Sequence, residues 1–241
     1  MIRPITLLVA LSIPAHADTT ISPFTENVLL HVMTHEMGHA VIREFDLPIL
    51  ANEEIAADQF ATFYLHQRFP DRVGDIVRAR ARSWEVEAED ETIFAEHPDD
   101  LRRAGYTLCF LYGLDPDRHA DLATEFDMTE DDAADCRDTA PEIARAWRRI
   151  LAPLAMPPGA RVTEVRLRAE DGPWKAALGA GETGEIMASL LSSIDWHSQI
   201  TLQVNRCDGG ASWSRNGREI TICDGLIDRF QEQALRIGDR D

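Results

Sequence analysis

The chain has 241 residues, of which 24 are lysine or arginine and 42 are aspartate or glutamate, so its formal net charge is −18. This length fits one domain or two small ones, and an apolar share of 44% is enough for a folded core. The charge argues against binding nucleic acid, whose phosphates need a basic surface, and against docking on anionic lipid. No apolar run reaches the roughly 18 residues of a membrane span, so we expect no stable membrane insertion.

The first seventeen residues have the pattern of a secretory signal peptide. Arg3 supplies the positive start, residues 5–13 form a short apolar core, and Ala15-His16-Ala17 is the small-x-small pattern after which signal peptidase cuts. Residue 18 is Asp18 and not the cysteine of a lipid anchor. The alternative is a buried N-terminal strand or helix. We expect residues 1–17 to be removed and the mature bacterial protein to be exported, to the periplasm or beyond.

The cysteines agree with export. The chain has four, Cys109, Cys136, Cys207 and Cys223, and an even number in an exported chain predicts two disulfides. Four cysteines allow three pairings, of which we favour the two that are local in sequence, Cys109–Cys136 and Cys207–Cys223. A structural zinc site is the alternative, but the sequence contains no C-x-x-C pair.

Capping and breaker signals predict a helical N-terminal part, residues 18–152. Ser22-Pro23 is typical of a helix start, and that helix should run to Phe45. Asn52 should cap a second helix through about residue 69. Further helices are expected over residues 71–89, 98–112, 129–136 and 141–151. We expect Gly113 to end the helix before it, and Thr129 to begin a capping box.

A proline-rich segment, residues 153–159, separates this part from residues 160–241, where the pattern becomes mixed. Residues 162–168 and 200–206 alternate like strands. Asn216-Gly217 predicts a hairpin turn before a return strand over residues 219–223, and a last helix should follow. The sequence therefore predicts an α+β fold that is mainly α, with a small C-terminal part containing a β-hairpin and packed on the helices.

One segment of the first predicted helix carries chemistry: His35-Glu36-Met37-Gly38-His39 is an H-E-x-x-H pattern. Histidines four residues apart lie on one helix face, so both imidazoles can bind one metal ion, and zinc suits such ligands. Glu36 lies next to that face and could act as general base toward a water held by the metal. The alternative is a solvated helix with two incidental histidines, since the pattern occurs by chance in roughly one chain in a hundred.

The next helix strengthens the metal hypothesis. A catalytic zinc takes three protein ligands and leaves a position open. Glu54 and Asp58 are four residues apart and share a face, so Glu54 can be the third ligand. Asp58 can then accept a hydrogen bond from the far ring nitrogen of a ligating histidine. Without a metal, acidic residues at a helix start are ordinary, but that alternative explains Asp58 less well, because it lies in an apolar run.

This arrangement, H-E-x-x-H followed by E-x-x-x-D on the next helix, resembles the zinc site of the gluzincin metallopeptidases. Residues 35–61, HEMGHAVIREFDLPILANEEIAADQFA, resemble more closely a bacterial family of exported metallopeptidases known by a domain-of-unknown-function label. Weaker similarity continues through Glu96-His97, Cys136 with Trp147, and the two hairpin cysteines.

The resemblance implies a zincin-like helical domain that hydrolyses peptide or protein substrates. It implies one zinc per chain with His35, His39 and Glu54 as ligands. Glu36 would be the catalytic acid and base, and Asp58 would support a ligand.

Three further residues near these motifs each allow two interpretations. His97 could stabilise an oxyanion from outside the metal shell, or could simply begin a helix. Arg103 could pair with an acid, but a surface position is expected. His31 could be an extra ligand, but packing at the helix entry is expected.

Two positions depart from the family's pattern. Cys223 is followed by Asp224-Gly225 in place of Tyr-Glu, and an Asn-Ala-aromatic step reads Ala211-Ser212-Trp213. If these residues line the cleft, substrate handling differs from the family's. Two alternatives to a protease therefore stay open: a zinc-containing envelope protein that binds partners without catalysis, or a helical protein without metal.

Overall fold

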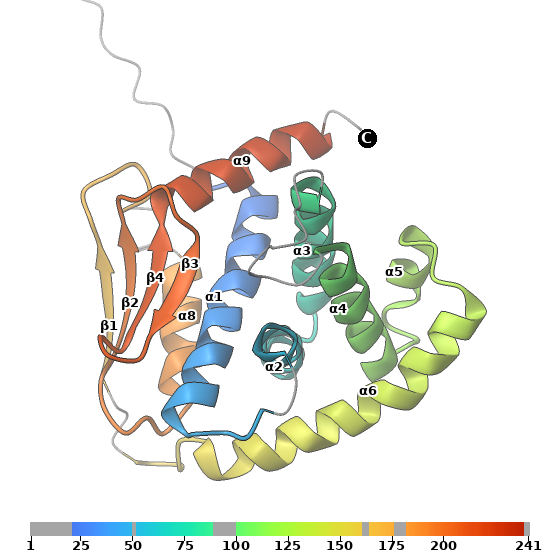
Figure 1. The fold of residues 1–241 in the computed structure, drawn as a ribbon, viewed down its shortest axis with the longest axis horizontal. Helices are drawn as coiled ribbons and strands as arrows, with labels where there is room; N and C mark the ends of the chain where they lie inside the picture. The colour runs from blue at the N-terminus through green and yellow to red at the C-terminus, as the bar shows by residue number, and fades with distance from the viewer. Residues whose placement is uncertain (1–20, 50–51, 89–99, 161–163, 176–181, 239–241) are drawn as a thin grey trace, which may run out of the picture.

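The structure is a computed structural model that describes residues 21–49, 52–88, 100–160, 164–175 and 182–238. The predicted signal peptide and His97 lie outside these residues, so both stay predictions. The fold is α+β and mainly α, as expected. Helices pack around the long central helix α1, and one small sheet, formed by strands from the C-terminal part of the chain, lies beside it (Figure 1).

Eight α-helices lie in the described residues. They are α1 (Pro23–Glu44), α2 (Glu53–Arg68), α3 (Val73–Glu87), α4 (Asp100–Leu114), α5 (Ala120–Glu125), α6 (Glu130–Leu151), α8 (Glu182–Ser192) and α9 (Asp224–Gly238), and a short 3-10 turn, η2 (Ala152–Leu154), follows α6. The predicted caps are confirmed: the side chains of Ser22, Asn52 and Thr129 each accept a hydrogen bond from a backbone N–H of the first turn. Helices α5 and α8 were not predicted.

Two predictions for the helical part were wrong. Gly113 does not end its helix but lies inside α4, where a side chain would collide with the backbone carbonyl of Cys136 on α6. The glycine lets the two helices approach closely, and the Cys109–Cys136 disulfide joins them at the same crossing. Pro141 does not separate two helices, because α6 continues through it with the proline on its exposed side.

The sheet contains β1 (Val165–Ala169), β2 (Ile200–Asn205), β3 (Ala211–Ser214) and β4 (Glu219–Cys223), in the order β1-β2-β4-β3. β3 and β4 form the predicted hairpin, while β1, β2 and β4 run parallel to one another. The Cys207–Cys223 disulfide ties the end of β4 to the residues that follow β2. Both disulfides are therefore the sequence-local pairs that we favoured.

Helix α1 lies at the centre of the molecule (Figure 1). It packs against α2, α3, α8, α9 and β3, and nearly all of its residues are buried. One apolar core runs through both parts of the chain and includes Met37, Trp84, Ile220 and Phe230. The predicted boundary at residues 153–159 remains a prediction. No helix among the described residues is long and apolar enough to cross a membrane. The polar residues of α1 are consequently held inside a packed core.

Candidate metal centre

The H-E-x-x-H face of α1 lies directly against α2. Gly38 permits this approach, because a Cβ there would lie only 3.1 Å from Ala57 Cα. The two helices run antiparallel, so that His35 meets Asp58 while His39 meets the first turn of α2. The predicted site residues thus come from two helices that pack at close range.

The three predicted ligands converge on one point. His35, His39 and Glu54 each offer a ligand atom, and these atoms lie within 4.8 Å of one another. His35 Nε2 lies 3.2 Å from Glu54 Oε2, and His39 Nε2 lies 3.2 Å from Glu54 Oε1. The two Nε2 atoms are 3.1 Å apart. Two imidazole nitrogens and one carboxylate at this spacing are the ligand types of a three-ligand zinc site.

A buried chain of polar groups fixes the ring of His35. Its Nδ1 donates to Asp58 Oδ1 over 2.7 Å, and Arg103 donates to both oxygens of that carboxylate over 2.8 and 3.0 Å. Asp58 therefore lies where the sequence placed it. The surface position expected for Arg103 was wrong: only 5% of the residue is exposed. The physical reason is that a buried carboxylate needs a compensating charge, which the guanidinium supplies in bidentate geometry.

These contacts set unusual charge states when no metal is bound. Burial alone would lower the pKa of His35, but the charge of Asp58 and hydrogen bonds to Asp58 and Glu54 outweigh it and raise this pKa to about 9. Burial would raise the pKa of Asp58, but His35 and Arg103 hold it well below its usual range. The surroundings of His35 Nε2 therefore favour a positive charge at the point where the three ligand groups meet.

His39 has a matching support that sequence reasoning missed. Its Nδ1 donates to Glu53 Oε1 over 2.7 Å, and Arg43 Nε donates to the same oxygen over 2.8 Å. The sequence indicates nothing more for Glu53 than an ordinary acidic residue at the start of a helix. Its position in the sequence could have indicated this role. Glu53 immediately precedes the ligand Glu54, so it lies in the turn of α2 that antiparallel packing brings next to His39. Because both Nδ1 atoms donate, each imidazole presents a lone pair at Nε2 once that nitrogen carries no proton, as metal binding requires.

The site opens into a cavity of about 540 Å³. His35, Glu36, Asp58 and Arg103 line one side of it. Glu36 is only 6% exposed and so reaches the cavity from within the core. Helix α9 and the start of β3 also line it and contribute Ala211, Leu226, Phe230 and Gln233. The cavity is large enough for part of a peptide, and the general-base candidate Glu36 lines it together with His35, which alone of the three ligand candidates does so in the described residues.

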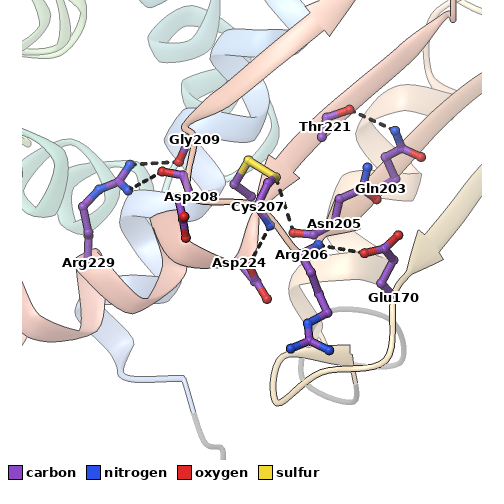
Figure 2. The surroundings of a disulfide bond; sticks show 11 residues. Glu170, Gln203, Asn205, Arg206, Cys207, Asp208, Gly209, Thr221, Asp224 and Arg229 are labelled. Carbon is purple, nitrogen blue, oxygen red and sulfur yellow. Dashed lines mark hydrogen bonds between the residues drawn. A yellow bond between two sulfur atoms is a disulfide. The ribbon is translucent and has the colours of Figure 1, made fainter.

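Of the two departures from the family's pattern, only Ala211 lines this cavity. Asp224 instead accepts a hydrogen bond from Cys207 N over 3.1 Å (Figure 2). Gly225 N donates to Cys207 O over 3.2 Å. A Cβ at Gly225 would approach that oxygen to 3.0 Å. Arg229 donates to the carbonyls of Asp208 and Gly209. Asp224 and Gly225 therefore secure the loop that leads into β3.

His31 is not among the three groups that converge, so the expectation that it packs rather than ligates fits its position. It lies against Trp84 with its ring centroid 5.5 Å from that of the indole. His66 and His119 do not line the cavity and face each other elsewhere, with ring centroids 6.4 Å apart. His97 lies outside the described residues and its catalytic role is untested.

Comparison with known families agrees with this geometry. Residues 14–151 match the family described as "Putative metallopeptidase". The chain belongs to this family. The match includes α1, α2 and α4, which supply the site, and ends before the sheet and α9. No curated protein matches the chain, and no solved structure does. Membership of a metallopeptidase family and a His-His-Glu group able to bind metal therefore coincide in the same helices.

Proposed function

We propose that this protein is an exported zinc metallopeptidase that cleaves peptide bonds with Glu36 as general acid and base. The observation that carries the proposal is the convergence of His35 Nε2, His39 Nε2 and the Glu54 carboxylate, with both far ring nitrogens already donating to carboxylates. Such partners orient ligating histidines and make them better ligands. A solvated helix with incidental histidines would not require this second set of contacts.

The residues present fit a zinc ion with one ligand position left open. When bound, the ion would polarise the scissile carbonyl and make the attacking water easier to ionise. Glu36, buried at the edge of the cavity, would take the proton from that water and pass it to the amine that leaves. Asp58 and Glu53 would hold the two imidazoles in place throughout.

The cavity also has room for an extended substrate. β3 ends the sheet order, so along the described chain one of its edges has no neighbouring strand. Gly210 and Ala211, where β3 begins, line the cavity. An extended peptide can pair with a free strand edge through its backbone, which suits cleavage of many sequences. The two disulfides fit an oxidising compartment outside the cytoplasm.

The competing proposal is an envelope protein that keeps the metal but has lost catalysis. Ala211 is the one departure that reaches the cavity, and it is the observation that favours this alternative. Against it, Glu36 is present and lies within the same cavity as the ligand His35.

The test compares wild type with Glu36→Gln, using the chain from Asp18 onward produced in a periplasm without a His tag. We expect about one zinc per chain by elemental mass spectrometry in both, and its loss in Glu54→Ala. Peptide hydrolysis should fall at least about a hundredfold in Glu36→Gln. Glu142→Gln, an exposed change on α6, is the matched control and should behave as wild type. Equal peptide turnover by wild type and Glu36→Gln would refute the peptidase proposal and favour the inactive envelope protein. Absence of bound metal, even after zinc is added, would refute both proposals.

A further inference from the structure

Helix α9 lines the cavity along most of its length, from Leu226 to Arg236. Gly210 and Ala211, where the chain enters β3, line the same cavity. All of these residues lie beyond residues 14–151, so the family match does not cover this side of the cavity. Its shape depends on how the segment before β3 is held against α9.

The ends of that segment, residues 207–210, are fixed by the backbone. Cys207 O accepts a hydrogen bond from Gly225 N over 3.2 Å, and Gly210 O accepts one from Cys223 N over 3.0 Å. The Cys207–Cys223 disulfide joins the same two strand ends covalently. Both ends of the segment therefore keep their places without help from any other side chain.

The middle of the segment depends on one side chain. Arg229 donates to Asp208 O over 3.2 Å and to Gly209 O over 3.1 Å (Figure 2). Among the described residues, no other hydrogen bond reaches Asp208 or Gly209. On its other side the segment lies against the disulfide, because a Cβ at Gly209 would be only 3.1 Å from Cys223 Sγ. The middle residues are thus held between the disulfide and Arg229.

Arg229 differs in this respect from two other arginines that line the cavity. Arg80 donates to the Glu87 carboxylate and Arg103 to the Asp58 carboxylate, whereas both hydrogen bonds of Arg229 go to backbone carbonyls. A guanidinium is a rigid planar fork, so its two terminal nitrogens can bond two successive carbonyls at once. This contact uses the shape of the side chain as well as its charge.

We propose that Arg229 is a positioning residue for substrate binding. By holding Asp208 and Gly209 it fixes the part of the cavity wall that Gly210 and Ala211 form, and the substrate binds against this wall. The proposal rests on the proposed peptidase function and adds a residue of α9 to it. A loop that is already ordered does not have to be ordered when the substrate binds, so affinity is higher.

The kinetic test compares zinc-loaded wild type with Arg229→Met on quenched fluorescent peptides of eight residues. We expect KM to rise at least about fivefold and kcat to stay within about twofold, because the change touches neither the ligand group nor Glu36. Binding of the same peptides to zinc-loaded Glu36→Gln, followed by fluorescence anisotropy, should weaken by the same factor when Arg229→Met is added. Zinc content should stay at one per chain.

A second measurement follows the segment itself and needs no peptide. Backbone order parameters from nuclear magnetic relaxation should be near 0.85 for Gly209 and Gly210 in wild type, and should fall below about 0.6 in Arg229→Met. The melting temperature should fall by less than about 4 °C, since Arg229 is exposed and the change removes only two hydrogen bonds.

Arg229→Lys separates positioning from direct contact with the substrate. It keeps the positive charge but cannot reproduce the fork, so KM should lie between those of wild type and Arg229→Met. Peptides that carry aspartate, asparagine or lysine at one position should all show the same rise in KM. Arg215→Met is the matched control: Arg215 is an exposed arginine at the other end of β3 that pairs with Asp46 and does not line the cavity. It should behave as wild type.

Three outcomes would overturn the inference. Unchanged KM in Arg229→Met, or unchanged order parameters, would refute the positioning role and leave the peptidase proposal standing. A rise in KM confined to aspartate peptides, and absent in Arg229→Lys, would show that Arg229 binds a substrate carboxylate directly. If zinc-loaded protein neither bound nor cleaved any peptide, the inference would fall together with the proposed function.

Discussion

Helix α1 carries three buried histidines at four-residue spacing, and their surroundings fall into two kinds. His35 and His39 each donate from Nδ1 to a carboxylate, and each carboxylate also accepts from an arginine. His31 has neither kind of partner among the described residues. The difference separates two surroundings on one helix: the first two rings are oriented by hydrogen bonds before anything binds, whereas the third packs edge-on against Trp84.

The charge states follow the same division. The pKa of His35 is raised to about 9, because Asp58 outweighs burial, and the pKa of His31 is lowered to about 3, because burial outweighs Asp58. The charge of Asp58 acts to raise the pKa of both histidines, but the net shift is upward at His35 and downward at His31, one helical turn away. At His35 the charge of Asp58 is reinforced by hydrogen bonds to Asp58, over 2.7 Å, and to Glu54, and His31 makes neither bond.

The largest effect is expected from breaking the His35 support with Asp58→Asn. This change removes the carboxylate that Arg103 hydrogen-bonds and leaves it only the more distant carboxylates of Glu54 and Asp100, at 3.8 and 3.9 Å. Loss of one partner of a buried ion pair costs up to about 3–5 kcal/mol of unfolding free energy. Zinc affinity should also fall about 10–100-fold, because a ligand has lost its orienting partner. Urea unfolding and competition with a zinc-binding dye measure the two effects.

The control for Asp58→Asn is the double variant Asp58→Asn/Arg103→Leu. It also removes the guanidinium that has lost its hydrogen-bonded carboxylate, so part of the lost stability should return while zinc affinity stays low. If the single variant is as stable as wild type, the pairing of Asp58 with Arg103 does not contribute to the fold in the way the geometry indicates.

A second effect, on the order of 3 kcal/mol on each side, concerns how the stability of the metal-free protein depends on pH. The folded pKa of His35 lies above its ordinary 6.5, so its contribution is complete below pH 6.5 and is lost as pH rises through 9. The folded pKa of His31 lies below 6.5, so its contribution is complete above pH 6.5 and is lost as pH falls toward 3. We expect stability to be highest near pH 6.5.

Urea unfolding between pH 4 and 10 checks this dependence. His31→Phe should flatten the decline between pH 6.5 and 4.5 relative to wild type, since the depressed pKa of Asp58 matters only below about pH 4. Thr107→Val changes a buried side chain that does not titrate, so its stability should fall with pH between 6.5 and 4.5 as it does in wild type. Zinc should reduce the loss on the alkaline side, because it replaces the proton on His35. If the free energy of unfolding fell equally in His31→Phe and wild type below pH 6.5, the lowered pKa of His31 would not be the cause of the loss.

The sequence predicted the local parts of this molecule well. Capping residues such as Ser22, Asn52 and Thr129 act within one turn, so helix starts could be read directly. The parallel pairing of β1, β2 and β4 could not be predicted, because it depends on α8 and on strands distant in sequence. Gly113 was misread for the same reason: its helix end was a local expectation, while the contact with α6 that requires glycine is not local.

The same limit applies to the metal centre. His35, His39 and Glu54 were found because fixed helical spacing relates the histidines and one short turn leads to the glutamate. For Arg103 the sequence allowed a pairing with an acid but favoured the surface, since its burial depends on α4 packing against α2. Glu53 was missed because an acidic first turn already explains it locally, and only the antiparallel packing of α1 on α2 shows that it holds His39.

Glu53 therefore gives the smallest and most informative prediction. It supports His39 as Asp58 supports His35, but its side chain is 31% exposed and that of Arg43 is 47% exposed, against 4% for Asp58. Water screens such a pair, so Glu53→Gln should lower the unfolding free energy by less than about 1 kcal/mol. The amide oxygen of glutamine can still accept from His39 Nδ1, so zinc affinity should fall by less than about tenfold, and the difference from wild type should shrink as salt is raised. Dye competition at low and high salt measures this. A loss as large as that in Asp58→Asn, unaffected by salt, would show that the charge facing a ligand histidine controls zinc binding regardless of its burial.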